Sequence, residues 1–174
     1  MLIRRALETD FPAMWPIFQQ VIEDESTYVF AASTSAADAH DYWFAPGVTS
    51  WVAEDEGLVV GMYKLVQNQR DLDAHVANAS FMVSPRCSGK GLGQMLGRHC
   101  LLEARRAGFL AMQFNFVVSS NTAAVALWKK LGFHIVGTLP RVFDHASLGL
   151  VDAYVMHRFL DDIELQGTLQ MRAL

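Results

Sequence analysis

A glycine-rich turn between a strand and a helix is the feature of this sequence that most limits its fold. The stretch 81–94 reads FMVSPRCSGKGLGQ, with glycine at positions 89, 91 and 93. The apolar residues at its start predict a strand, and a helix-forming run over 91–107 follows the turn at once. Because glycine has no Cβ, several backbone N–H groups can point at one anion, and the helix N-terminus adds a partial positive charge. The turn therefore indicates either a tight connection or a site for a phosphate-bearing ligand.

Hydrophobic periodicity and turn residues divide the rest of the chain into helices and strands. Helices are expected at about Asp10–Glu23, Ser35–Phe44, Gly91–Ala107 and Asn121–Leu131. Strands are expected at Leu2–Arg5, Trp51–Glu54, Leu58–Gln67, His75–Val83, Ala111–Val118, Phe133–Val136 and Ala153–Phe159. Segment 24–34 is expected to be irregular, and segment 137–152 to form a long loop. This order predicts an α/β (α+β) fold with a mixed sheet, in which the glycine turn follows the carboxyl end of a strand, where ligands tend to bind.

Length and charge restrict the class of protein. The 174 residues suit a single domain, expected at 1–160, followed by a tail at 161–174. The net charge of −4 and the absence of a long basic run argue against nucleic acid as the main partner. No apolar run approaches the ~20 residues of a membrane span, so no membrane partner is expected. The N-terminus becomes charged too soon for a signal peptide.

The sequence contains two cysteines, Cys87 and Cys100. Their spacing fits no metal-binding motif, so no metal is expected. Two thiols without a secretory signal are typical of a reduced, cytoplasmic protein.

A second motif, NTAAVALWKKLGF at 121–133, follows the glycine turn and the next predicted strand. Together with VSPRCSGKGLG at 83–93, it resembles the paired signatures of the GCN5-related N-acetyltransferase (GNAT) family. Segments 75–83, 113–118 and 137–156 are also similar to the branch that acetylates proline analogues and amino acids. The resemblance implies a mostly antiparallel sheet of about seven strands flanked by about four helices. It also implies acetyl-CoA as co-substrate and direct transfer of the acetyl group to an amine.

The resemblance implies a path for CoA across the chain. It places the pyrophosphate over 88–94, the pantetheine arm along the strand edge at 81–83, and the thioester carbonyl at the N–H of Val83, as a donor to developing negative charge. Asn121 is expected beside the CoA arm and as an ordinary helix cap. The implied CoA-binding residues are Phe81, Met82, Val83, Ser88, Gly89, Lys90, Gly91, Leu92, Gly93, Gln94, Asn121 and Trp128.

Two positions depart from the family pattern. Ser88 stands where Arg or Gln usually precedes the first glycine, so phosphate binding relies more on the backbone, with Arg86 and Lys90 as nearby cations. Trp128 stands where the family often has a tyrosine that acts as general acid. An indole N–H donates a hydrogen bond but does not release a proton usefully. A thiol with a pKa near 8.5 can leave as the thiolate, so this change need not abolish turnover.

Asn78 and Asn115 are polar residues inside two apolar strands that flank the implied CoA slot. They either form a structural hydrogen bond between strands or hold the acceptor without taking its proton. The second interpretation suits an amine that loses its proton without a general base. The reference pKa of an α-amino group is about 8 and that of a lysine side chain is near 10.4. Free amino acids lie between these cases. With Val83, these two residues are the candidates for catalysis.

Four further residues are candidates for binding the acceptor. Tyr28 and Phe30 are expected in the pocket wall or simply in the core, and Phe143 is expected to cap the pocket. Arg141 is expected either to pair with a substrate carboxylate or to form a surface salt bridge. No general base is singled out from the remaining candidates, Glu23, Glu25, Asp73, His75, His145 and Asp152.

The sequence therefore predicts an enzyme, an acetyl-CoA-dependent N-acetyltransferase of a small amine, with an amino acid or an analogue as the favoured acceptor. Two alternatives stay open. The acceptor is a protein N-terminus or lysine, or the chain is a non-catalytic acyl-CoA-binding module. The resemblance also allows a homodimer.

Overall fold

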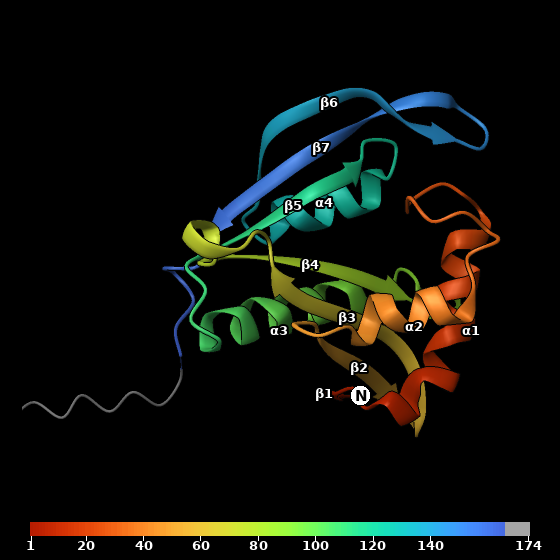
Figure 1. The fold of residues 1–174 in the computed structure, drawn as a ribbon, viewed down its shortest axis with the longest axis horizontal. Coiled ribbons are helices and arrows are strands. Elements are labelled where there is room, and N and C mark those ends of the chain that lie inside the picture. The colour runs from red at the N-terminus through yellow and green to blue at the C-terminus, as the bar shows by residue number, and fades with distance from the viewer. Residues whose placement is uncertain (166–174) are drawn as a thin grey trace, which may run out of the picture.

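The computed structural model describes residues 1–165 of the chain. Seven strands form one sheet in the order β1-β2-β3-β4-β5-β7-β6 (Figure 1). The strands are β1 (Leu2–Arg5), β2 (Thr49–Asp55), β3 (Leu58–Gln67), β4 (Val76–Val83), β5 (Ala111–Val118), β6 (His134–His145) and β7 (Gly149–Phe159). The α-helices are α1 (Phe11–Glu23), α2 (Ala36–Phe44), α3 (Leu92–Arg106) and α4 (Thr122–Lys130), and the 3-10 helices are η1 (Glu8–Asp10), η2 (Asp71–Asp73) and η3 (Pro85–Cys87).

Within residues 1–165, β4 and β5 are the one parallel pair, and all other neighbouring strands are antiparallel. The expected mixed, mostly antiparallel sheet of seven strands with four helices is confirmed.

Each face of the sheet has its own hydrophobic core. On one face, residues of α1 and α2 such as Phe18 and Trp43 pack against Met82. On the other face, residues of α3 and α4 pack against Ala77, Ala79 and Phe81. Because successive strand residues point to opposite faces, β4 is shared between the two cores. The side chains at 78 and 80 therefore point toward α1 and α2.

β4 and β5 pair only where they begin, at Val76↔Ala111 and Ala77↔Met112, and then diverge (Figure 1). Ser84 N–H donates to the carbonyl of Val60 in β3 at 2.9 Å. Since successive residues of a strand direct their backbone groups to opposite sides, residues 79, 81 and 83 point theirs into the gap beside β5. The divergence thus opens a slot lined by backbone donors and acceptors.

The glycine turn forms where it was expected, but its glycines have different tasks. Gly89 and Gly91 have left-handed φ angles of +73° and +83°, and a Cβ on either would meet nothing within 4 Å. Gly93 lies inside α3, where a Cβ would come within 3.2 Å of Leu127 in α4. The first two glycines shape the turn and leave open space beside it, whereas the third permits close helix packing.

Segment 137–152, expected as a long loop, instead extends β6 and β7, which are joined by a turn at 146–148. The pairing of β6 with β7 is irregular between Leu139 and Phe143. That irregularity, with Pro140 inside it, breaks the alternation that would identify a strand in the sequence. β6 lies at the edge of the sheet, where proline is tolerated.

Packing continues past the end of β7. Leu160 is fully buried, and its N–H donates to the carbonyl of Leu110 at 2.9 Å. Most of the tail expected at 161–174, namely residues 166–174, lies outside the described residues. None of the helices in residues 1–165 combines the length and the apolarity that crossing a membrane requires.

Candidate active site

A cavity of about 230 Å³ lies where β4 and β5 diverge. Its wall comes from both strands, α4 and its N-cap, one residue of α2, and the irregular segment 24–34. Seven residues predicted for the site from the sequence line it: Tyr28, Phe30, Asn78, Phe81, Asn115, Asn121 and Trp128. The fold therefore brings the predicted acceptor and CoA residues into one place.

Tyr28 covers part of the exposed edge of β4. Its hydroxyl accepts a hydrogen bond from Phe81 N–H at 3.0 Å and donates one to the Phe81 carbonyl at 2.5 Å. Asn78 Oδ1 accepts a bond from Ala79 N–H at 2.8 Å. Three backbone N–H groups of β4 face the gap beyond the paired residues. Side chains already bond to two of them, Ala79 and Phe81, and the third belongs to Val83.

A chain of amide side chains fixes Asn115. Gln113 Nε2 donates to Asn115 Oδ1 at 2.8 Å, and Asn115 Nδ2 donates to Asn68 Oδ1 at 2.7 Å. The chain links β5 to the residue that follows β3. Asn115 thus makes the structural hydrogen bond that was one of its two expected roles, while it also lines the cavity.

Sequence reasoning missed a polar cluster of Lys64, Tyr42 and Ser80. The Tyr42 hydroxyl and Ser80 Oγ are 2.5 Å apart, and both residues line the cavity. Lys64 Nζ donates to the Tyr42 carbonyl at 2.8 Å and lies 3.1 Å from the centre of its ring. Burial lowers the pKa of Lys64 to about 8. A lysine inside the apolar run of β3 was the one available signal.

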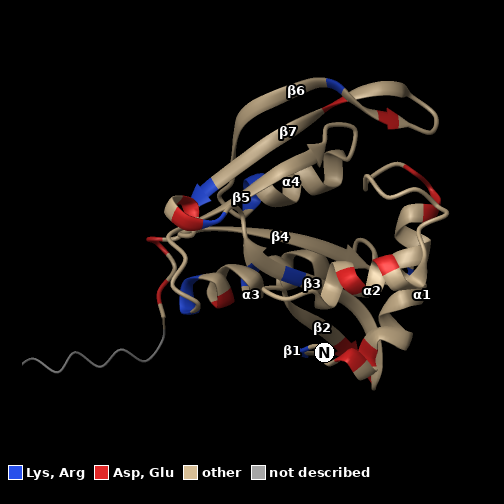
Figure 2. Cartoon of the chain, viewed as in Figure 1, with Lys and Arg blue, Asp and Glu red and all other residues tan. Residues whose placement is uncertain are grey.

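The wall holds no strong acid or base. Among the described residues that line the cavity there is no Asp, Glu, His, Lys or Arg, and β4 and β5 carry no charged residue (Figure 2). Burial raises the pKa of both lining tyrosines, Tyr28 and Tyr42, so both stay protonated. The base candidates Glu23, Glu25, Asp73, His75, His145 and Asp152 do not line the cavity.

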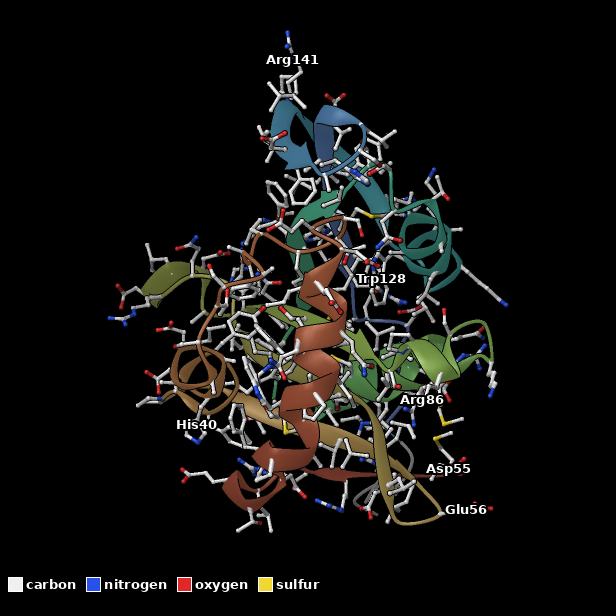
Figure 3. All side chains as sticks on the ribbon, turned by 90° about the vertical axis from the view of Figure 1, so that its right-hand side faces the viewer. His40, Asp55, Glu56, Arg86, Trp128 and Arg141 are labelled. Atoms are coloured by element: carbon white, nitrogen blue, oxygen red, sulfur yellow. The ribbon has the colours of Figure 1, made fainter. Side chains whose placement is uncertain are left out.

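Two residues expected to bind the acceptor, Arg141 and Phe143, do not line the cavity either, so their part in acceptor binding stays a prediction. Arg141 extends away from the body of the molecule (Figure 3), and its backbone N–H donates to Asp152 Oδ1 at 2.9 Å. Phe143 is buried and packs against Phe116, with ring centres 6.2 Å apart. Because β6 and β7 form an extended hairpin instead of a loop, Arg141 lies beyond the site. Phe143 only supports a lining residue from behind.

Aromatic side chains and a helix cap form the side of the cavity nearer α4. Trp128 lies 4.8 Å, centre to centre, from both Phe81 and Phe114. Asn121 caps α4, with its Oδ1 accepting a bond from Ala124 N–H at 3.1 Å. Its expected role as a helix cap is confirmed, and its presence in the lining leaves the expected role beside CoA open.

The remaining CoA candidates surround the glycine turn. Met82 and Leu92 are buried in the two cores, so only their backbone groups can reach a ligand. Ser88, Gly89, Lys90 and Gly91 are exposed, whereas Gly93 and Gln94 are half-buried. An exposed turn with open space beside two glycines suits a pyrophosphate bound mainly by backbone N–H groups. Among residues 1–165, no cluster of His, Cys, Asp or Glu has the arrangement of a metal site.

Comparison with known proteins agrees with this geometry. The acetyltransferase (GNAT) family matches the chain over residues 11–133. The L-amino acid N-acyltransferase MnaT of Escherichia coli is 30% identical over 148 residues, which cover 82% of this chain and 84% of the relative. The N-acetyltransferase aca1 of Schizosaccharomyces pombe is 26% identical over 162 residues, which cover 82% of this chain and 77% of the relative.

Solved structures share the fold. A GCN5-related N-acetyltransferase from Kribbella flavida superposes with a TM-score of 0.87 at 38% identity, over 91% of this chain and 96% of that chain. The acetyltransferase yncA from Salmonella typhimurium, solved with its cofactor acetyl-CoA, gives a TM-score of 0.82 at 25% identity, over 97% of this chain and 98% of that chain. The slot, the glycine turn and these matches lead to one conclusion: the chain belongs to the GNAT family of N-acetyltransferases and uses acetyl-CoA as its co-substrate.

Proposed function

We propose that this enzyme transfers the acetyl group of acetyl-CoA directly to the α-amine of an amino acid or of an amino-acid analogue. The observation that carries the proposal is a small cavity walled by aromatic and amide side chains without a general base. Deprotonating the α-amine of a chain terminus near pH 7.4 costs about 1 kcal/mol, against about 4 kcal/mol for a lysine side chain, and free amino acids lie between these cases. Such a wall therefore favours α-amines over lysine side chains.

The names of two relatives support this acceptor class. MnaT of Escherichia coli is an L-amino acid N-acyltransferase. A relative from Salmonella typhimurium, 29% identical over 148 residues, is an L-methionine sulfoximine/L-methionine sulfone acetyltransferase.

In the proposed mechanism the chain positions the reactants and stabilises charge. The Val83 N–H donates to the thioester oxygen as negative charge develops there. Asn115 and Asn78 orient the acceptor, whose amine enters in its neutral form. Trp128 packs beside the CoA arm. The neutral amine forms a bond to the thioester carbon, the C–S bond breaks, and CoA leaves as a thiolate, since its pKa is near 8.5. The surplus proton on the nitrogen passes to that thiolate or to solvent.

The proposed CoA site uses the backbone of the turn. The N–H groups of 88–94 bind the pyrophosphate. The edge of β4 at 81–83 pairs with the pantetheine arm through Val83, because the Tyr28 hydroxyl already engages both backbone groups of Phe81. The open left-handed positions of Gly89 and Gly91 support this placement.

A thiol-release assay tests the proposed function. Free CoA is measured with acetyl-CoA and three acceptor classes: free L-amino acids, a peptide with a free N-terminus, and Nα-acetyl-lysine. We expect turnover with amino acids and little with Nα-acetyl-lysine. Turnover that is confined to Nα-acetyl-lysine, or that is absent for every amine despite CoA binding, would overturn the proposal.

A protein N-terminus is the second candidate acceptor. The [ribosomal protein bS18]-alanine N-acetyltransferase of Salmonella typhimurium is 26% identical over 148 residues. A peptide N-terminus has an α-amine pKa of about 8, so a wall without a general base also admits it, and the peptide arm of the assay distinguishes the two acceptors. The cavity, whose wall includes part of segment 24–34, must then admit an extended chain.

We further propose that the domain spanning 1–160 works in the cytoplasm as a homodimer. Cys87 and Cys100 are free thiols, which suits a reducing compartment. The edge strand β6 exposes apolar side chains, which an interface would cover: Ile135, Val136, Leu139 and Val142.

A further inference from the structure

Lys64 is a buried cation beside the acceptor cavity. Lys64 is only 8% exposed, and no carboxylate in residues 1–165 forms an ion pair with its ammonium group. Its contacts are the Tyr42 carbonyl at 2.8 Å and the Tyr42 ring at 3.1 Å. A carbonyl dipole and a π face compensate a buried charge only partly.

The fold places this cation directly behind the cavity wall. Lys64 lies opposite Ser80 in the β3–β4 register, so the two side chains share one face of the sheet. Ser80 and Tyr42 bond to each other and line the cavity. Within the described chain, Lys64 is the one Lys or Arg that contacts a lining side chain through a hydrogen bond or a cation–π interaction.

A buried, poorly compensated cation favours a ligand that brings negative charge nearby. A carboxylate on the acceptor supplies that charge. Asn78 can donate a hydrogen bond to it from Nδ2, because its Oδ1 already accepts one from Ala79 N–H. The same positive potential disfavours an ammonium group in the cavity. It therefore lowers the pKa of the incoming amine and favours the neutral, nucleophilic form without a general base.

We propose that Lys64 is a specificity-determining residue that selects acceptors with a free carboxylate through the wall formed by Tyr42 and Ser80. This inference rests on the proposed function and narrows it to acceptors in which an α-amine and a carboxylate occur together. Arg141, which was expected to supply this charge, extends away from the site (Figure 3). Lys64 acts from β3 instead.

The test compares L-methionine, which carries a carboxylate, with L-methioninamide, which lacks it. The amine pKa also differs between the two, so the readout is the change in their ratio from one variant to another. Steady-state kcat/KM is measured for both acceptors with the wild type, Lys64→Met and Lys64→Arg. Lys64→Met keeps the length of the side chain without its charge, and Lys64→Arg keeps the charge. We expect Lys64→Met to lower the methionine-to-methioninamide ratio by about tenfold. We expect Lys64→Arg to retain most of the ratio and the acetyl-CoA KM to stay unchanged.

Other outcomes separate the possible failures. An equal loss for both acceptors would show that Lys64 only supports Tyr42 and would overturn the inference. Acetylation of both acceptors by the wild type without preference for the carboxylate would overturn it too, while the proposed function stands. No acetylation of any α-amine would overturn the proposed function itself.

A measurement on the wild type alone covers the case in which Lys64→Met does not fold. 4-(Methylthio)butanoate carries the carboxylate of methionine but no amine. We expect it to compete with the acceptor, and the matching alcohol to compete at least several-fold less well. Equal inhibition by the two compounds would contradict carboxylate selection.

Discussion

At the scale of single side chains, Asn115 is held in the cavity wall by its neighbours. Both ends of its amide are bonded, one to Gln113 and the other to Asn68. Asn115 lines the cavity, whereas Asn68 does not. Its orientation is therefore set by two residues outside the cavity, which would reduce the entropy lost on binding in the proposed role of Asn115 toward the acceptor.

Replacing Asn68 tests this arrangement. Asn68→Ala removes the acceptor of the Asn115 Nδ2 bond, and such a bond contributes about 1 kcal/mol. We expect kcat/KM for the amine acceptor to fall about fivefold, with the acetyl-CoA KM unchanged. Asn68→Asp keeps an oxygen at this place and serves as the matched control. Unchanged acceptor kinetics in Asn68→Ala would show that the amide chain has no positioning role.

Among the structural elements, the glycine turn and α3 form the proposed phosphate site. Gly91 is the N-cap of α3 in a left-handed conformation, whereas Arg86 lies in η3, ahead of the turn. Before the first glycine of the turn, the family usually has Arg or Gln, and here Ser88 stands at that position. The turn therefore depends on its backbone geometry more than on any side chain.

Two substitutions separate backbone from side-chain binding. Gly91→Val places a β-branched residue at φ +83°, which costs on the order of 1–3 kcal/mol and redirects the N–H groups. We expect the acetyl-CoA KM to rise at least about tenfold. Arg86→Ala should raise it much less. Thermal melts of both variants check that each is folded. The reverse order of KM effects would contradict backbone binding at the turn.

The contact between α3 and α4 is a second feature at this scale. A Cβ at Gly97 would come within 2.5 Å of Leu131 Cδ1 and 3.3 Å of Trp128 Cζ3. Gly97→Val overpacks this contact, so we expect a loss of about 1–3 kcal/mol in unfolding free energy and a displaced Trp128 ring. Urea unfolding and the acetyl-CoA KM report these effects. Gly93→Ala, next to the flexible end of Leu127, is the milder comparison, and equal losses in both would contradict the packing argument.

Across the whole molecule, the sequence predicted what depends on local pattern. Neighbouring residues in the sequence were enough to predict three features: the glycine turn, the helix cap at Asn121, and the strand alternation that places Asn78 in the cavity wall. The contact of Lys64 with Tyr42 was not, because it joins β3 to α2 and only tertiary packing creates it. The sequence did not reveal the β6–β7 hairpin, because irregular pairing hides the alternation of its residues. The expectation that Arg141 lies in a loop over the site followed from the same irregularity.

The same hairpin carries the last prediction, which concerns assembly. Val136 is 60% exposed on the edge strand, and burying such apolar side chains favours association. We expect the wild type to have twice the chain mass in light scattering coupled to size exclusion.

Val136→Glu should be monomeric, because a carboxylate in an apolar interface is strongly unfavourable. Leu72→Glu adds the same charge at an exposed apolar residue of η2, outside β6, and should stay dimeric. Because no residue of β6 lines the cavity, the Val136→Glu monomer should keep its activity. A monomeric wild type would contradict the proposed homodimer, and a dimeric Val136→Glu would exclude β6 as its interface.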